Sequence, residues 1–298
     1  MPANMYCPRL DHFVRFNPNG TVSRCGHMVD APQFNTLDEM DESQWLHNVK
    51  SSMHKGLWPV WCERCKQTES KNGSSIRLNA VEFDKIQTKK DYLSVGGVLD
   101  NVCNSACLTC DENHSTLIGG LKSKVYTIVD NSNKFWSLPL DRVVHLDING
   151  GEPSHSKNYK HILANLPPSI KSVRLNTNCS TVLEELLPLV QRGVDVTVTV
   201  SLDGIGAIHD FVRWPVKWDK FYGNLMRYKE MSVKLNLWTT VSALNIDDLP
   251  NIIAFTQEHN IDHSYAYLKE PVELAVENKD TPESLAYIQE QKRLRGIE

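Results

Sequence analysis

The sequence lacks an apolar run long enough to cross a membrane, and it lacks an excess of positive charge. Its longest apolar runs have only the length of a strand, and its formal net charge is −4 at pH 7. The N-terminal residues show no basic segment followed by an apolar stretch, so we expect no secretory signal. Basic, aromatic-rich segments typical of a nucleic-acid groove are also missing. These absences predict a soluble, cytoplasmic protein with no membrane partner and no strong nucleic-acid signature.

Eight cysteines stand out against this ordinary composition. Disulfides are rare in a reducing cytoplasm, where clustered thiols more often bind metal or take part in catalysis. Seven of the eight fall into two groups, while Cys179 stands alone. The first group comprises Cys7, Cys25, Cys62 and Cys65, and the second comprises Cys103, Cys107 and Cys110. Four thiolates can close a metal site, whereas three leave one coordination position open.

The chain of 298 residues is long enough for a barrel-sized domain and a small additional one. Residues 1–75 are rich in turn formers and weakly periodic, which favours a small metal-organised domain. Residues 71–75 are typical of a linker. Residues 90–275 are predicted to form the main domain, and residues 276–298 a C-terminal helical tail. The helix Pro282–Arg295 is expected to lie on the surface with a solvated basic end.

Strand-like and helix-like runs alternate in the main domain, which predicts an α/β fold with parallel strands. The predicted strands are Tyr92–Val102, Val143–Asn149, Ser172–Asn178, Val194–Leu202, Lys234–Ser242 and His263–Leu268. The predicted helices between them include Thr181–Arg192, Lys220–Met231 and Asp248–Asn260. Such an array forms either an open sheet or a barrel.

Several of these strands have one apolar and one polar face. In the run 194–201, valines alternate with Asp195, Thr197, Thr199 and Ser201. A parallel strand buried on both faces is usually apolar throughout. We therefore favour a barrel with a polar interior that holds a ligand. An antiparallel sheet with one solvated face is the alternative, but the intervening helices argue against it.

The three-cysteine group forms a Cys-x3-Cys-x2-Cys run directly after the first predicted strand of the main domain. A loop of this kind can place three thiolates around a [4Fe–4S] cluster and leave one iron without a protein ligand. A zinc site that takes His114 as its fourth ligand is the alternative.

Further polar motifs follow the next strands. Gly150, Gly151 and Glu152 follow the second strand, and Asn176-Thr177-Asn178-Cys179 ends the third. Ser201-Leu202-Asp203-Gly204 ends the fourth and precedes His209, Asp210 and Arg213. In this order the motifs resemble those of the radical S-adenosylmethionine (SAM) superfamily. The resemblance implies a partial (β/α)6 barrel with an open [4Fe–4S] cluster that binds SAM and generates a 5′-deoxyadenosyl radical.

The resemblance also implies roles for individual residues. The glycines Gly150 and Gly151 would allow close approach to the ligand, and Glu152 would accept a hydrogen bond from the SAM ammonium. The SAM-binding set is completed by Asn178, Ser201 and Arg213, with Arg213 as a carboxylate clamp, and Asp203 is assigned a catalytic role. A turn-forming Asp203 and a solvated Arg213 are the alternatives. Cys179 replaces a usual glycine, either as a small buried side chain or as a hydrogen-atom donor.

The first cysteine group is arranged around a predicted hairpin. Asn19-Gly20 sets a turn between strand-like residues 13–16 and 21–24, which could bring Cys7 and Cys25 together. A four-cysteine zinc ribbon and an iron–sulfur cluster are both compatible with the spacing. The order of the cysteines resembles the twitch domain, the short form of the SPASM domain, which holds an auxiliary [4Fe–4S] cluster. Here it precedes the barrel, as in N-terminal-twitch radical SAM proteins often found in phage genomes.

The resemblance implies an oxidoreductase or maturase that oxidises or cross-links a peptide or protein side chain. Its electron donor would be of the flavodoxin or ferredoxin type. Modification of a nucleotide or nucleic acid is one alternative. The other is a zinc-stabilised binding module without catalysis, which would leave the motif Gly150–Pro153 unexplained.

Overall fold

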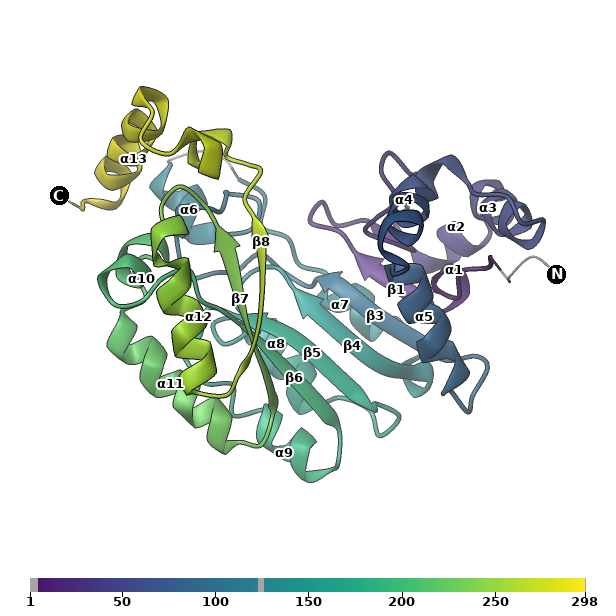
Figure 1. Ribbon diagram of the computed structural model, residues 1–298. Coiled ribbons are helices and arrows are strands. Elements are labelled where there is room, and N and C mark those ends of the chain that lie inside the picture. The colour runs from purple at the N-terminus through teal and green to yellow at the C-terminus, as the bar shows by residue number, and fades with distance from the viewer. Residues whose placement is uncertain (1–4, 123–125, 298) are drawn as a thin grey trace. The chain divides into compact units, whose positions relative to one another are not determined.

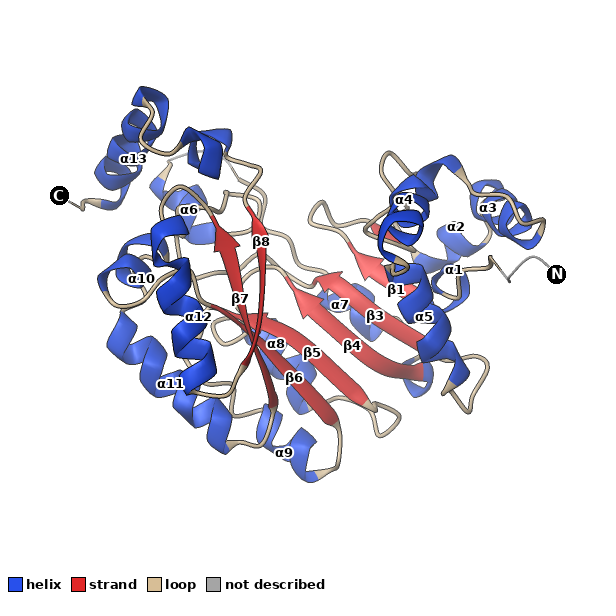
Figure 2. Cartoon of the chain, viewed as in Figure 1, coloured by secondary structure: helices blue, strands red, loops and turns tan. Residues whose placement is uncertain are grey.

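The computed structural model describes residues 5–122 and 126–297. Residues 1–4, where the sequence predicts no secretory signal, lie outside the described residues. Every predicted site residue lies within them. The fold is α/β, with an eight-stranded sheet that is mostly parallel (Figure 2). The predicted fold class is therefore confirmed. The chain divides into two compact units, each built from several segments. The first contains residues 1–99, 130–148 and 167–170, and the second contains residues 100–129, 149–166 and 171–298.

The strands of the first unit are hydrogen-bonded in the order β2-β1-β3-β4. They are β1 (Phe13–Phe16), β2 (Val22–Ser23), β3 (Leu93–Val98) and β4 (Val143–Asn149). β1 and β2 pair antiparallel around Gly20, which has a φ of +80°, so the predicted hairpin is confirmed. β1 also pairs in parallel with β3, with Phe13 opposite Ser94. The predicted hairpin thus joins β3 in one sheet, a pairing that the sequence does not indicate.

The first unit also contains helices that the sequence analysis does not predict. They are α1 (Arg9–His12), α2 (Leu37–Asp41), α3 (Gln44–His54), η1 (Val60–Cys62), α4 (Glu63–Asn72), α5 (Ile76–Lys85), α7 (Ser132–Trp136) and η2 (Leu140–Arg142). Leu46, Val49 and Met53 of α3 are buried, so this unit has an apolar core beside its cysteines. The expected linker is the junction of two helices, because Gly73 ends α4 at φ +64° and the Ser75 side chain caps α5.

The second unit consists of parallel strands that alternate with helices (Figure 1). Its strands are β5 (Ser172–Thr177), β6 (Asp195–Ser201), β7 (Lys234–Val241) and β8 (Asp262–Tyr267), in that order. All three neighbouring pairs are parallel. The helices are α6 (Thr116–Leu121), α8 (Lys157–Ala164), α9 (Leu186–Gln191), α10 (Ala207–Val212), α11 (Trp218–Glu230), α12 (Leu249–Glu258) and α13 (Pro282–Arg295), with short turns η3 (Ile246–Asp248), η4 (Val272–Leu274) and η5 (Val276–Asn278). The predicted alternation and strand positions are confirmed.

One face of β6 is apolar and buried and the other is polar, as predicted, and helices cover β6, β7 and β8. Val196, Val198 and Val200 are buried, while Ser201 is partly exposed. Helices α9, α11 and α12 pack against β6, β7 and β8 respectively, and α11 buries Phe221 and Leu225 on the face that its periodicity predicts. Because β5 and β6 are parallel, the polar motifs at their C-terminal ends meet at one edge of the sheet.

Helix α13 has the predicted bounds, but the prediction that its basic end is solvated is wrong for Arg295. The Arg295 side chain is only 8% exposed, and Gln291 is also buried. Arg293, by contrast, faces solvent and pairs with Glu290. A basic residue in the last helical turn usually remains in water, so the sequence alone does not reveal this burial. Among the described residues, no helix combines the length and apolar character that a membrane span requires.

Candidate functional site

Cys103, Cys107 and Cys110 line one cavity of about 260 Å³ in the second unit. Their loop is tied to the end of α10 by two backbone hydrogen bonds. Ala106 N donates to Trp214 O at 2.8 Å, and Leu108 N donates to Val212 O at 3.0 Å. The three predicted cysteines therefore lie at one site, on a loop that backbone hydrogen bonds hold in place.

The Arg295 side chain of α13 also forms hydrogen bonds to the backbone of this loop. Its Nε donates to Ala106 O at 2.8 Å, and its Nη2 lies 3.4 Å from Cys107 O. Its Nη1 donates to the backbone and side-chain oxygens of Gln291, at 3.0 and 2.7 Å. The sequence analysis misses this residue, because no motif distinguishes it from the other basic residues of the helix.

The Gly-Gly-Glu turn packs directly against the backbone that precedes Cys103. Glu152 N donates to Val102 O at 2.8 Å. Gly151 has a φ of +24°, and a Cβ at this position would lie 2.6 Å from Val102 O. Any side chain would therefore push the turn away from the cysteine loop. Gly151 thus permits a close approach to the chain's own backbone, and both glycines line the cavity.

Glu152 lines the cavity with a carboxylate that is largely satisfied within the protein. Its side chain is 1% exposed. Oε1 accepts hydrogen bonds from Ser154 N at 2.9 Å and Thr177 Oγ1 at 2.7 Å, and Oε2 accepts one from Asn178 N at 2.6 Å. Since each oxygen can accept two hydrogen bonds, one acceptor position remains on Oε2.

Asn178, predicted to bind SAM, lines the cavity but uses its amide to join β5 to the cysteine loop. Its Nδ2 donates to Asn104 Oδ1 at 2.9 Å and to Ser105 Oγ at 2.6 Å. Ser201 also lines the cavity. Both predicted residues therefore lie at the site, with Asn178 in a structural contact.

Arg213 and Asp203 form an ion pair beside the cysteines. Arg213 Nη1 donates to Asp203 Oδ2 at 3.1 Å, and Thr240 N donates to Asp203 Oδ1 at 2.8 Å. Burial raises the pKa of Asp203, and Arg213 opposes this rise. Arg213 lines the cavity, and its buried Nε has no hydrogen-bond partner among the described residues. Asp203 is 1% exposed and is not part of the cavity lining.

Burial governs the protonation of the three thiols in the cavity. Burial raises the pKa of Cys103 to about 12, and it also raises the pKa values of Cys107 and Cys110. Without a metal these thiols therefore stay protonated at neutral pH, whereas ligation requires thiolates. Ser105 N lies 3.4 Å from Cys103 Sγ, where an N–H group can stabilise a ligating sulfur.

A single metal ion and a cluster place different demands on the positions of the three thiols. No three His, Cys, Asp or Glu side chains of residues 5–122 and 126–297 are grouped to hold one metal ion. A zinc ion needs thiolates that converge within about 2.3 Å of one point, whereas a [4Fe–4S] cube takes thiolates from around a larger volume. His114 lines the cavity, but its Nδ1 lies 2.9 Å from Asp111 Oδ1.

Cys179 lies away from the cavity and is completely buried. Its φ is +60°, which explains why glycine would suit this position. Its Sγ lies 3.7 Å from Phe221 O, and burial raises its pKa well above the usual value. The structure thus places this thiol in the packed interior rather than at the site.

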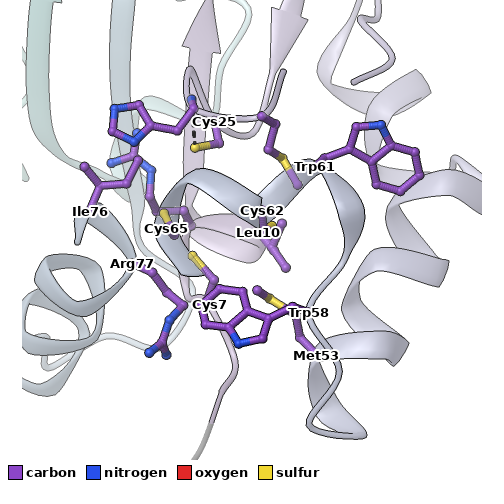
Figure 3. A pocket seen from close by; sticks show the side chains of 13 residues that line it. Cys7, Leu10, Cys25, Met53, Trp58, Trp61, Cys62, Cys65, Ile76 and Arg77 are labelled. Atoms are coloured by element: carbon purple, nitrogen blue, oxygen red, sulfur yellow. Dashed lines mark hydrogen bonds between the residues drawn. The ribbon is translucent and has the colours of Figure 1, made fainter. Parts of the chain in front are cut away.

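The four cysteines of the first group surround a separate cavity in the first unit (Figure 3). Cys7 precedes α1, Cys25 follows β2, Cys62 ends η1 and Cys65 lies in α4. Burial raises the pKa values of Cys7 and Cys62 to about 12. The free volume is only about 20 Å³, so a cluster can enter only if these side chains rotate outward. The donor set of four thiols suits a closed site.

The surroundings of this cavity are apolar and cationic. Trp58, Trp61 and Met53 are among its lining residues. His27 N donates to Cys25 Sγ at 3.3 Å. Burial lowers the pKa of His27 to about 4, and nearby arginines, Arg64 first among them, lower it further. His27 is therefore neutral at pH 7, and the positive charge near the four cysteines comes from arginines.

No family model and no curated protein matches the chain. Among solved structures, native anSMEcpe with bound AdoMet is similar over 59% of this chain and 53% of its own, at 16% identity and a TM-score of 0.46. Streptococcus suis SuiB bound to S-adenosylmethionine is similar over 95% of this chain and 68% of its own, at 14% identity and a TM-score of 0.48. SuiB bound to precursor peptide SuiA is similar over 97% of this chain and 70% of its own, at 16% identity and a TM-score of 0.45. The chain spans about half the length of anSMEcpe, and similarity at this level indicates neither a shared activity nor a shared substrate.

Proposed function

We propose that the protein is a radical SAM enzyme whose catalytic [4Fe–4S] cluster is held by Cys103, Cys107 and Cys110. The observation that carries this proposal is the convergence of three separate motifs on one cavity. The three thiols, the Gly150–Glu152 turn and the buried Arg213 all line it. The expected resemblance to the radical SAM superfamily rests on the same residues.

When bound, the cluster and SAM supply an electron that cleaves the sulfonium C–S bond and a 5′-deoxyadenosyl radical that removes a hydrogen atom from the substrate. Cys103, Cys107 and Cys110 would hold the cluster as thiolates and would leave its fourth coordination position open, since no fourth thiol of the described residues lines the cavity. The main-chain contacts of the loop fix their positions.

Two charged groups of the cavity suit the amino-acid end of SAM. Glu152 Oε2 keeps one acceptor position for an ammonium group. Arg213 Nε is a buried donor without a protein partner, which suits a carboxylate. Ser201 is available for the ribose. We assign Asp203, expected from the sequence to be catalytic, a positioning role, since it contacts Arg213 and Thr240 rather than the cavity.

We further propose that Cys7, Cys25, Cys62 and Cys65 hold an auxiliary [4Fe–4S] cluster, as the twitch-like order of these cysteines implies. A closed second cluster suits a reaction in which a substrate radical must lose an electron. The substrate we favour is a peptide or protein side chain that is oxidised or cross-linked, on the basis of the Ser201–Gly204 segment. A flavodoxin or ferredoxin is the expected electron donor.

The test is metal and sulfide analysis with EPR spectroscopy on anaerobically purified protein, followed by dithionite and SAM. We expect about eight irons per chain, a [4Fe–4S] signal that SAM perturbs, and 5′-deoxyadenosine as a product. Two zinc ions and no 5′-deoxyadenosine would instead support a binding module and overturn the proposal.

Cys107→Ala is expected to abolish formation of 5′-deoxyadenosine, because only two thiolate ligands would remain. Cys179→Ala is the matched control, since this cysteine is buried outside the cavity, and it should retain SAM cleavage. Cleavage that survives in the Cys107 variant would contradict the catalytic assignment. The assay is chromatographic detection of 5′-deoxyadenosine after reduction.

A further inference from the structure

A second polar cavity of the first unit, of about 130 Å³, adjoins the four-cysteine site. It could hold roughly four water molecules at about 30 Å³ each. Its polar lining includes Arg15, Asn17, Ser23, Arg24 and Trp45, and no Asp or Glu side chain lines it. Cys25 lines both this cavity and the four-cysteine cavity. Arg24 is paired with Asp41, so Arg15 supplies the positive charge of this lining that no acidic side chain balances.

Arg15 is the main source of this charge. Its Nη1 donates to Asn17 Oδ1, and it forms no ion pair with an acidic side chain of the described residues. A Cβ at Gly26 would lie 2.8 Å from Arg15 Nε, so the glycine leaves the room in which the guanidinium lies. Arginine remains charged in proteins. A half-buried cation without a carboxylate partner calls for an anion from outside the protein.

Two further donors around the cavity lack acceptors. Arg24 is 2% exposed, and its Nη groups bind Phe13 O, at 3.0 Å, and the Asp41 carboxylate, but its buried Nε has no partner. Trp45 Nε1 is likewise buried without a partner among the described residues. Buried donors normally find acceptors. The residues of the lining thus include one charged group without an acidic partner and two buried N–H groups without an acceptor among the described residues.

We propose that this cavity is a binding site for a small oxyanion, a carboxylate or a phosphate, which is held by Arg15 and accepts from Arg24 Nε and Trp45 Nε1. Oxyanions combine negative charge with several acceptor positions, and both features match the lining. An anion bound here lies next to Cys25. The site rests on the arrangement of these donors and does not depend on the proposed SAM chemistry.

The experiment is a thermal-denaturation titration of the full chain with acetate, inorganic phosphate and chloride at constant ionic strength. We expect acetate or phosphate to raise the melting temperature with a saturable dependence, and chloride to have little effect. The anion that saturates at the lower concentration shows whether the site prefers a carboxylate or a phosphate. If neither oxyanion gives saturable stabilisation, the cavity holds only water and the proposal is wrong.

Arg15→Gln is expected to weaken oxyanion binding at least about tenfold, because the charge-assisted hydrogen bonds are lost. Arg64→Gln is the matched control, since Arg64 is exposed and lies outside the cavity lining, and its binding should equal that of the wild type. Trp45→Phe removes one donor without changing charge, so it tests the site even if the Arg15 variant does not fold. Unchanged binding in both cavity variants would place the anion elsewhere and overturn the proposal.

Discussion

At the scale of single residues, Glu152 both forms hydrogen bonds within the protein and lines the cavity. Its three internal hydrogen bonds hold the end of β5, and one acceptor position of Oε2 remains. The sequence analysis recovers its identity and its place at the site. The sequence does not reveal the internal bonds, because two come from backbone N–H groups and the third from Thr177 of another segment.

Glu152→Gln is expected to weaken SAM binding by about tenfold or more with little change in iron content, since the side chain keeps its shape and loses its charge. Glu152→Ala should also lower the free energy of unfolding, by about 1–3 kcal/mol for each buried donor left unpaired. Isothermal titration with SAM and urea denaturation measure the two effects. The exposed Glu184→Gln is the control. Unchanged SAM affinity in the Gln variant would exclude the ligand-binding role.

His209 makes stability depend on pH. Its side chain is fully buried, neither ring nitrogen has a partner among the described residues, and burial lowers its pKa to about 3, with a further contribution from Arg213. The unfolded chain binds this proton near pH 6.5. The stability gained from the neutral ring is therefore present above pH 6.5 and is lost as the pH falls from there toward 3.

Between pH 7 and pH 5, we expect His209 to contribute a loss of about 2 kcal/mol in the free energy of unfolding. His209→Phe should remove this part of the pH dependence, whereas a substitution of the exposed His47 should retain it. Urea denaturation at both pH values measures the difference. Equal pH dependence in the wild type and the Phe variant would show that His209 does not titrate as the structure implies.

At the scale of elements, α13 acts as a support for the cysteine loop. Arg295→Ala should lower iron content and SAM cleavage in parallel, because Ala106 O and Cys107 O lose their donor. Arg293→Ala on the same helix is the matched control, since Arg293 is exposed and pairs only with Glu290. Iron analysis after anaerobic reconstitution is the measurement. Full iron loading in the Arg295 variant would argue against the positioning role.

Some helices and strands can be predicted from the sequence and others cannot. The strands and helices of the second unit follow from period-2 and period-3.6 patterns, which reflect burial on one face. Helix α4 was not predicted, because it is polar on most of its surface and offers little apolar periodicity to detect. Helix α3 was not predicted either, although Leu46, Val49 and Met53 have helical spacing and are buried. The parallel pairing of β1 with β3 joins segments far apart in sequence, and no local pattern encodes such a contact.

At the scale of the whole molecule, the two thiol groups lie in different compact units. The composition of each unit from several chain segments cannot be predicted from local patterns, because it arises from long-range contacts. The grouping of the cysteines by spacing, by contrast, agrees with the two cavities that they line.

Cys62→Ala is therefore expected to reduce iron by about half while SAM cleavage persists. It removes a ligand of the first unit, and all residues of the 260 Å³ cavity belong to the second. EPR spectra and 5′-deoxyadenosine assays on the same preparation measure both properties. Complete loss of SAM cleavage would mean that the four-cysteine site supports the fold of the second unit.

The contact between Arg295 and Ala106 also has a consequence for biosynthesis. The two residues are 189 positions apart in the chain. At the usual translation rates of about 5–20 residues per second, the ribosome needs roughly 10–40 s to pass from one to the other. During that interval the nascent cysteine loop exists without the hydrogen bonds from Arg295, so its backbone is less constrained just after synthesis than in the folded protein.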